Sequence, residues 1–322
     1  MQSKTIAKYK CNQKRLQKNG ISYKIDENGG TLMNKYVSLI MDIEKSKTYD
    51  VSDRNEMQHY MDKCIKNLNS LFDEEMQCEV IFSAGDELQG LFNNVVTALL
   101  YFRMLEMLMK PVKIRAGIGI GDWTVKMEKG LSTQQDGPAY HKARQAIKEV
   151  HSMQLQNIRI CSDEDDALAN HLINASLPLK RQQIYMQNIV QVLIELLFPF
   201  VPVDFNLNKY DSVKELTAIK FEYRLGSKNG GLYSRRNIVM EQEYLNLNEI
   251  PDPLPIYIEG EIVDAESTII KKNTAMSISE ILQCSRQNVD SIMRRGNAYK
   301  IRELDYVALQ YVRNNYGGSR WN

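Results

Sequence analysis

The chain has 322 residues, enough for two domains or for one domain with a large appendage. Its 41 basic and 40 acidic residues nearly cancel, so any attraction to nucleic acid or membrane must come from a local patch. The five cysteines form no CxxC pair, which argues against a disulfide framework and against a zinc ribbon. The longest apolar stretch, residues 189–203, is interrupted by Gln191, Glu195 and two prolines, whereas a membrane span needs about 20 apolar residues. We therefore expect a soluble, cytosolic protein that does not enter a membrane.

Composition divides the chain into four regions. Residues 1–35 are polar and rich in lysine, which is typical of a solvated tail and also suits a phosphate-binding arm. Residues 36–176 carry alternating strand and helix patterns, and residues 177–250 form an accessory helical and mixed region. The region 251–322 begins with a linker, because three prolines in five positions exclude both a helix and a sheet ladder.

The second region has the element order strand, helix, strand, strand, helix, strand. Its expected strands are residues 36–43, 78–82, 87–92 and 112–120; one helix is expected at 53–72 and another from a cap at Asn93 or Asn94 to residue 109. This order predicts an α+β fold of the ferredoxin-like (βαββαβ) type, with an antiparallel sheet that helices cover on one face. Further helices are expected at residues 139–153, 163–173 and 181–197, with a strand at 157–161.

Two acids occupy neighbouring positions in this sheet. Asp42 ends the first strand, and Asp86 lies with Gly85 at the tip of the hairpin between the second and third strands. In a split βαβ sheet these elements are neighbours, so both carboxylates are expected at one edge, where two oxygen anions and a backbone carbonyl suit Mg²⁺. Gly85 would let the backbone approach a phosphate closely. The alternative is structural: Asp42 caps a helix, and Gly85 and Asp86 simply form a turn.

Four segments resemble the SatD family in sequence, order and spacing. They are residues 39–43 (LIMDI), 83–92 (SAGDELQGLF), 114–122 (IRAGIGIGD) and 136–146 (DGPAYHKARQA). The resemblance extends over residues 36–173.

The same strands are more distantly similar to the palm domain shared by class III nucleotide cyclases and GGDEF-type cyclases. This resemblance implies that Asp42 and Asp86 bind Mg²⁺ or Mn²⁺, with the carbonyl of Ile43 as a further ligand. Residues 137–144 are similar to the cyclase helix that carries a sugar-contacting Asn and a transition-state Arg. His141 stands in place of the Asn, and Arg144 lies one residue early. The implied catalytic set is Asp42, Asp86, His141 and Arg144.

A nucleotide in this site needs groups that neutralise its phosphates. The residues that we assign to nucleotide binding are Ile43, Gly85, Glu87, Lys126 and Lys142. Each lysine is alternatively a solvated side chain, and His141 suits acid–base work because histidine titrates near neutral pH. Arg115 has two interpretations, a phosphate ligand or the partner of a neighbouring acid. The other three histidines, His151 among them, are interpreted as ordinary helix residues.

Gly117, Gly119 and Gly121 alternate along the fourth strand and therefore share one of its faces. The favoured interpretation is close packing of a helix on a bare strand. The alternative is room for a nucleotide base or ribose beside Asp42.

Residues 277–296 fit a helix-turn-helix template. Its apolar seam consists of Ile278, Leu282, Val289 and Met293, with the turn at Gln283 and Cys284 and a cap at Ser285. The DNA-binding residues that we assign are Arg286, Gln287 and Asn288 for base edges and Arg294 and Arg295 for phosphates, with Lys300, Arg302 and Arg313 extending the basic surface. The turn lacks its usual glycine, and this motif also serves in protein interaction, so both uses stay open.

Three functions follow from these motifs. The first is a metal-dependent, nucleotide-binding palm protein, a nucleotidyl cyclase or oligonucleotide synthase that forms phosphodiesters from nucleoside triphosphates. The alternative is a DNA-binding transcriptional regulator whose palm senses a nucleotide or has lost its catalysis; a scaffold that binds proteins through both modules is a third. We expect a homodimer, because cyclase-type palms often complete their site across a dimer interface.

Overall fold

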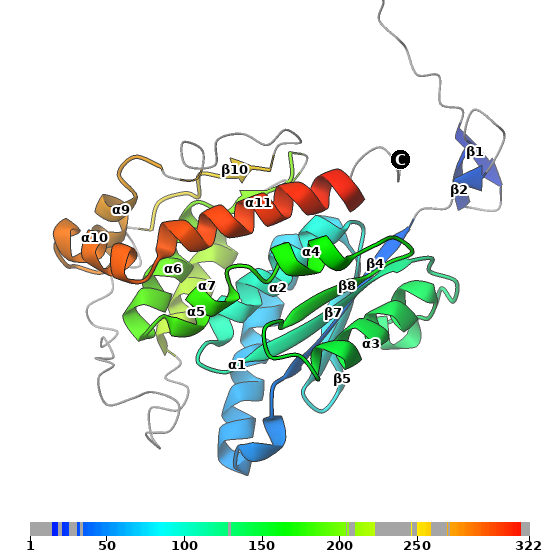
Figure 1. Cartoon of the computed structure of the whole chain (residues 1–322), viewed down its shortest axis with the longest axis horizontal. Coiled ribbons are helices and arrows are strands. Elements are labelled where there is room, and N and C mark those ends of the chain that lie inside the picture. The colour runs from blue at the N-terminus through cyan, green and yellow to red at the C-terminus, as the bar shows by residue number, and fades with distance from the viewer. Residues whose placement is uncertain are drawn as a thin grey trace, which may run out of the picture.

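The computed structural model describes most of the chain (Figure 1). The described residues are 35–127, 130–203, 205, 210–222, 246, 250–258, 269 and 271–316, together with the backbone of three short strands nearer the N-terminus. Those strands, β1 (Arg15–Lys18), β2 (Ile21–Ile25) and β3 (Thr31–Leu32), form an antiparallel sheet of their own. The remainder of the lysine-rich region and part of the accessory region lie outside the described residues.

A five-stranded mixed sheet forms the centre of an α+β fold. In chain order its strands are β4 (Tyr36–Ile43), β5 (Met76–Ala84), β6 (Glu87–Phe92), β7 (Ile114–Gly121) and β8 (Ile158–Cys161), and in space they lie in the order β5-β6-β4-β7-β8. All five strands were expected from the sequence. The expectation of an antiparallel sheet is wrong at one edge, because β8 runs parallel to β7. A helical crossover connects these two strands and returns the chain in its original direction.

Helices cover both faces of this sheet, which corrects the expectation that they cover one. The helices α1 (Val51–Phe72) and α2 (Val95–Met109) pack with Leu39 and Met41 of β4, whereas α3 (Pro138–Val150) packs with Ile40. Successive residues of a strand point to opposite faces, so the continuous apolar run in β4 serves two layers.

The glycines of β7 are explained by helix packing. A Cβ on Gly119 would lie 2.0 Å from the backbone oxygen of Ala139, and one on Gly117 would lie 2.3 Å from that of Ala143. Both contacts are with the backbone of α3, which cannot yield as a side chain can. The bare strand therefore brings α3 close to the sheet, as favoured from the sequence, and this helix fills the space that the alternative gave to a nucleotide base.

The rest of the chain adds further helices. They are α4 (Ala167–Leu172), α5 (Leu177–Gln182), α6 (Tyr185–Leu197), α7 (Tyr210–Glu222), α9 (Thr274–Ile281), α10 (Arg286–Arg295) and α11 (Ala298–Tyr316), with 3₁₀ turns at Ser46–Thr48, Asp73–Glu75 and Ser132–Gln134. Of these helices, α6 and α11 pack directly on α2. The helix expected at 181–197 is divided into α5 and α6, since Gln183 adopts an extended backbone with ψ of 130°. In the described part of the chain, no helix has the length and apolar character of a membrane span.

The proline-rich stretch lies against α6 and the strand that follows it. There β9 (Phe200–Val201) pairs in parallel with β10 (Ile256–Tyr257), and the N–H of Leu254 donates to the carbonyl of Leu197 at 2.8 Å. These backbone hydrogen bonds fix the path of the chain on its way to α9.

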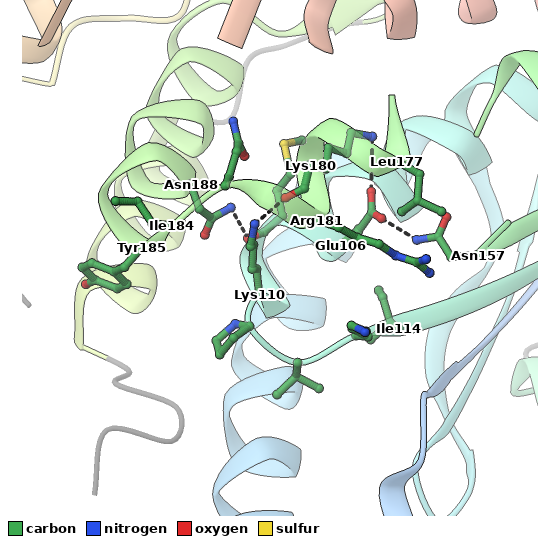
Figure 2. A pocket seen from close by; sticks show the side chains of 15 residues that line it. Glu106, Lys110, Ile114, Asn157, Leu177, Lys180, Arg181, Ile184, Tyr185 and Asn188 are labelled. Atoms are coloured by element: carbon green, nitrogen blue, oxygen red, sulfur yellow. Dashed lines mark hydrogen bonds and ion pairs between the residues drawn. The ribbon is translucent and has the colours of Figure 1, made fainter. Parts of the chain in front are cut away.

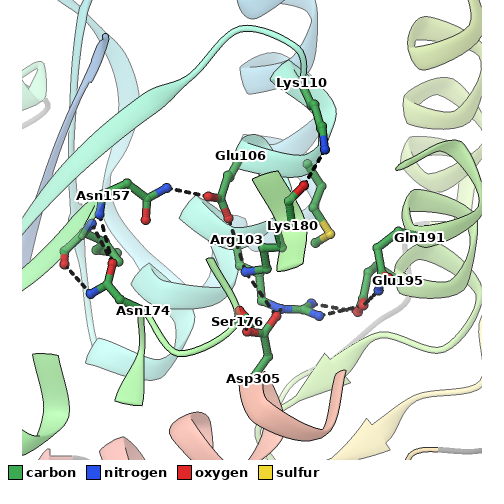
Figure 3. Close-up of polar contacts among 12 residues, drawn as sticks. Arg103, Glu106, Lys110, Asn157, Asn174, Ser176, Lys180, Gln191, Glu195 and Asp305 are labelled. Carbon is green, nitrogen blue, oxygen red and sulfur yellow. Dashed lines mark hydrogen bonds and ion pairs between the residues drawn. The ribbon is translucent and has the colours of Figure 1, made fainter. Parts of the chain in front are cut away.

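A buried network of charged side chains connects α2, α6 and α11 (Figure 3). Arg103 of α2 donates to both carboxylate oxygens of Glu195 on α6, at 2.6 and 2.7 Å, and to Asp305 on α11 at 2.6 Å. Arg302 of α11 also donates to Glu195, and neither of these two side chains is exposed. Burial alone would raise the pKa of Glu195, but Arg103 and Arg302 hold it below its ordinary value. The expectation that Arg302 extends a basic surface is therefore wrong.

Candidate functional site

The tip of the β5–β6 hairpin is built around Gly85. Ala84 pairs with Glu87, which leaves Gly85 and Asp86 as a two-residue turn, as the sequence predicted. Gly85 has a φ of +62°, a left-handed conformation that favours glycine, and no neighbouring atom lies within 4 Å of where its Cβ would be. Gln58 of α1 donates to the Gly85 carbonyl at 3.2 Å. The turn is thus held by α1 while its glycine stays uncovered.

Asp86 lies beside the end of β4. Its Oδ2 accepts a hydrogen bond from the backbone N–H of Ile43 at 3.3 Å. Ile43 directly follows Asp42, and β4 pairs with β6, so the turn and the end of β4 meet at one end of the sheet. We call this set of four residues, Asp42, Ile43, Gly85 and Asp86, the acidic end.

The carboxylate of Asp42 has two cationic or titratable partners. Arg115 of β7 donates from Nε to Oδ1 at 2.9 Å and from Nη2 to Oδ2 at 3.3 Å. His151, which follows α3, places its Nε2 2.7 Å from Oδ2. Asp42 and Arg115 are mostly buried, with 17% and 18% of their side chains exposed, whereas His151 is half exposed. Asp42 is therefore a bound carboxylate at the end of the central strand β4 and caps no helix.

Arg144 reaches the hairpin from α3. Its Nη1 lies 3.5 Å from Oε1 of Glu87, and its Nη2 donates to the side chain of Gln89 at 3.2 Å. Glu87 also accepts a hydrogen bond from Ser83 at 2.6 Å, which fixes its carboxylate. Two residues assigned separately from the sequence, Glu87 and Arg144, are therefore in contact beside the acidic end.

Lys126 and Lys142 lie at the opposite end of the sheet. Lys126 Nζ sits over the rings of Tyr36, at 5.2 Å, and Trp123, at 4.8 Å. Lys142 pairs with Asp163 at 2.7 Å, and its hydrogen bond lowers the pKa of that exposed carboxyl. Tyr36 begins β4, and Asp42 lies at the other end of that strand. The structure therefore does not bring these lysines to the acidic end.

His141 also lies away from Asp42. It is in the first turn of α3, where its Nε2 lies 3.1 Å from Asp136. The helix runs back along β7, so its far end carries His151 to Asp42, ten residues or about 15 Å further on. The predicted set of site residues is thus divided between two ends of one sheet.

The donors at the acidic end suit Mg²⁺ or Mn²⁺. Carboxylate oxygens are the ligands that these ions prefer. An ionised carboxylate has about four lone-pair positions, and Asp42 uses three of them for Arg115 and His151, so one remains for a cation. Among the described residues, no three His, Cys, Asp or Glu side chains gather around one point. A cation held by Asp42 and Asp86 would therefore complete its shell with backbone and phosphate oxygens.

Two residues of this site were not predicted from the sequence. His151 was interpreted as an ordinary helix residue, and Gln58 was not singled out. The signal for His151 is the direction of α3: a helix that begins beside the end of β7 and returns along it ends where β7 begins, next to Asp42. Gln58 carries no comparable signal, because its contact depends on how α1 lies against the hairpin.

The family model of the SatD family matches residues 36–242. This is well over half of the chain. The chain belongs to the SatD family. No curated protein matches it. A solved structure described as a bacterial light-regulated adenylyl cyclase aligns at 11% identity with a TM-score of 0.29, covering 39% of this chain and 42% of the other. The chain thus spans less than half the length of that protein.

The SatD match includes the acidic end and stops before α9 and α10. In α9, α10 and the turn between them, the expected apolar seam is buried; it consists of Ile278, Leu282, Val289 and Met293. Ser285 caps α10 by accepting from the N–H of Asn288 at 3.2 Å. The residues assigned to DNA binding, Arg286, Gln287, Asn288, Arg294 and Arg295, are all exposed. Arg313 instead donates to the carbonyl of Ile258.

Proposed function

We propose that the acidic end binds a nucleoside triphosphate with Mg²⁺ or Mn²⁺, and that the chain forms a phosphodiester from it as a nucleotidyl cyclase or oligonucleotide synthase. The observation that carries the proposal is the hydrogen bond from the N–H of Ile43 to Asp86, which joins the hairpin turn to the strand end that carries Asp42. The spatial order β5-β6-β4-β7 supports it, since this is the order of a ferredoxin-like βαββαβ palm.

In this reaction a hydroxyl oxygen attacks the α-phosphorus of the triphosphate, a new P–O bond forms and pyrophosphate leaves. A divalent cation held by Asp42 and Asp86 would supply charge stabilisation for the phosphates. The uncovered turn at Gly85 lets a phosphate approach the backbone without a steric barrier.

Three side chains that border the acidic end complete the proposed site. Arg115 and His151 contact Asp42, and Arg144 contacts Glu87. More than half of the Arg144 side chain is exposed, so it can turn towards a phosphate and offset developing negative charge. In this proposal the imidazole of His151 accepts the proton of the attacking hydroxyl.

The test is metal-dependent binding of a fluorescent nucleoside triphosphate, followed by chromatography of each unlabelled triphosphate after incubation with the protein and Mn²⁺. Asp42→Asn and Asp86→Asn should abolish the metal-dependent binding and leave the circular dichroism spectrum unchanged. The matched control is Asp62→Asn, which removes an exposed acid that pairs with Lys66 on α1. Binding that persists in both acidic-end variants contradicts the proposal.

DNA binding is the second candidate function, and the exposed leading face of α10 favours it. Arg286 is 64% exposed and is tethered only loosely, by a 3.7 Å contact with Asp290 one turn later. Arginine and amide side chains at the start of such a helix are the groups that reach base edges in a major groove. Fluorescence anisotropy with a random pool of labelled duplexes at low salt tests this function directly, and the absence of binding there rejects it.

We further propose that the chain acts as a homodimer. In one copy of the chain, Lys126, His141 and Lys142 lie away from the acidic end. A dimer would bring charged groups of a second copy to that end. It would also present two α10 helices to DNA half-sites separated by whole helical turns. Light scattering over a range of concentrations, with and without nucleotide, checks this; a monomer throughout is the contrary result.

A further inference from the structure

A cavity of about 220 Å³ lies between the end of α2, the start of β7 and the α5–α6 corner (Figure 2). Its wall at the sheet includes Ile114, which pairs with Ile43 across β4 and β7 but faces α2. Asp42 and Arg115 belong to the opposite, α3-facing side of the same strands. The cavity is therefore separate from the acidic end, although both lie at the same end of the sheet.

The cavity carries an excess of positive charge. Its charged lining residues are Glu106, Lys110, Lys113, Lys180 and Arg181. Lys180 lies 3.2 Å from Glu106 and 3.2 Å from Asp305, so acids offset its charge. Arg181 donates to the neutral carbonyl of Gln154 at 2.7 Å, and neither it nor Lys113 forms an ion pair with any residue that the structure describes. Two exposed cations thus stand at the cavity together with half-buried Lys110.

The remaining lining is mostly apolar. Met107, Val112, Ile114, Leu177 and Ile184 contribute to it. A volume of about 220 Å³ is far more than one water molecule needs, so the space suits a small molecule. Ligand sites combine an apolar lining with a few placed polar groups in this way.

We propose that this cavity binds a small organic phosphate. The dianionic phosphate group lies among Lys110, Lys113 and Arg181, and the uncharged part of the molecule lies against Val112, Ile114 and Leu177. Three cations suit a phosphate monoester better than a singly charged carboxylate, because a dianion balances more of their charge. The site is independent of the proposed triphosphate site and needs no metal.

The cavity also contacts the C-terminal helices through one of its walls. Gln183, which lines it, donates from Nε2 to the carbonyl of Gly296 at the end of α10, at 2.8 Å. A ligand that shifts Gln183 therefore acts directly on the end of the helix whose other end carries Arg286.

Pyridoxal 5′-phosphate is a suitable probe, because its aldehyde condenses with a lysine amine, with loss of water, and borohydride reduces the imine to a stable amine. Lys110 donates to the carbonyl of Lys180 within the cavity, and burial lowers its pKa to about 8, which increases the neutral, reactive fraction at pH 7.5. Labelled lysines are identified by mass spectrometry of the full-length protein after digestion. We expect Lys110 to be the most rapidly labelled lysine.

Two comparisons make the result specific. Pyridoxal, which lacks the phosphate, should label Lys110 about tenfold more slowly, and Lys113→Gln or Arg181→Gln should slow the phosphate probe by about the same factor. Lys66→Gln, an exposed lysine of α1, is the matched control and should have no effect.

The ratio of labelling at Lys110 to labelling at Lys220 reports whether the protein stays folded, because Lys220 is only 2% exposed in the native structure. We expect a ratio far above one in the native protein, and inorganic phosphate should lower the rate at Lys110. Equal labelling by both probes, unchanged rates in the two cavity variants, or a ratio near one each overturns the proposal. Rates that acetate lowers as strongly as phosphate does would also overturn it, in favour of a general anion site.

Discussion

Arg115 stands directly opposite Asp42 in the antiparallel pairing of β4 and β7, and its guanidinium contacts both oxygens of that carboxylate. The pair is partly shielded from water at one end of the two inner strands, so it contributes more to stability than a fully solvated ion pair. It also holds the Asp42 carboxylate in one orientation, beside the N–H that Asp86 binds.

Replacing Arg115 by Gln should therefore destabilise the protein by about 1–3 kcal/mol, because Asp42 would lose a partner while remaining mostly buried. Urea unfolding monitored by circular dichroism measures this loss. Arg159→Gln is the matched control, since Arg159 pairs with Glu149 at 2.6 Å in a more exposed setting. An equal loss of stability in the two variants would show that the shielding of the Asp42 pair has no effect.

The DNA-binding proposal separates two arginines of α10 by role. Arg286→Ala should cost about 1–3 kcal/mol of binding free energy and relax sequence preference, because Arg286 is at the end of the helix that would face bases. Arg295→Ala should weaken binding to all sequences alike and reduce the slope of affinity against salt by about one. Anisotropy titrations at several salt concentrations measure both effects. Identical behaviour of the two variants would argue for a protein-interaction module.

Lys220 provides a pH-dependent test of the core. It donates to the carbonyls of Met107, Leu108 and Lys110 at 3.2, 2.8 and 2.8 Å, and burial lowers its pKa to about 7. An unfolded lysine has a pKa of about 10.4, so between these values the unfolded chain binds more protons and stability rises with pH. Lys220→Met removes this group, and the stability difference between wild type and variant should grow from pH 7 to pH 10.

The expected slope of that difference is on the order of 1 kcal/mol per pH unit. Chemical unfolding of both proteins at four or five pH values measures it. Lys214→Met, an exposed lysine on the same helix, should show a difference that does not change with pH. A constant difference for Lys220→Met as well would mean that its amine titrates alike in the folded and unfolded states.

Because α3 lies so close to β7, adding even a methyl group to a glycine of this strand should lower the free energy of unfolding. Gly119→Ala would place a methyl group 2.0 Å from the backbone oxygen of Ala139, so α3 must move, and we expect a loss of about 1–3 kcal/mol. Gly85→Ala meets no such neighbour and should cost about 1–2 kcal/mol through its positive φ alone. Thermal unfolding compares them. Only the first should also alter the contact of His151 with Asp42, which histidine NMR chemical shifts report.

The strands of the sheet and the turn at Gly85 could be predicted because both rest on local patterns of apolar residues and glycine. The sequence left Arg115 with two interpretations, a phosphate ligand or the partner of a neighbouring acid, because the choice depends on strand register and a slip of one residue would turn Arg115 to the other face. The structure pairs it with Asp42. Lys126 and Lys142 were assigned to nucleotide binding from their charge. Their distance from Asp42 follows from the direction of the chain along β4 and α3, which charge does not indicate.

The buried network determines what happens when the chain is shortened. Its cations are Arg103, Lys180 and Arg302, and its acids are Glu106, Glu195 and Asp305, so the charges balance only while α2, α5, α6 and α11 are assembled. A stop codon in the proline-rich stretch would delete Arg302 and Asp305. The buried side chains of Arg103, Lys180 and Glu195 would then each lose a charged partner. Removing one side of a buried pair costs about 3–5 kcal/mol, a large share of the stability of a typical domain. Truncation alleles ahead of α11 should therefore behave as complete losses of the protein, and a phenotype of the C-terminal helices alone will need point substitutions on their exposed faces.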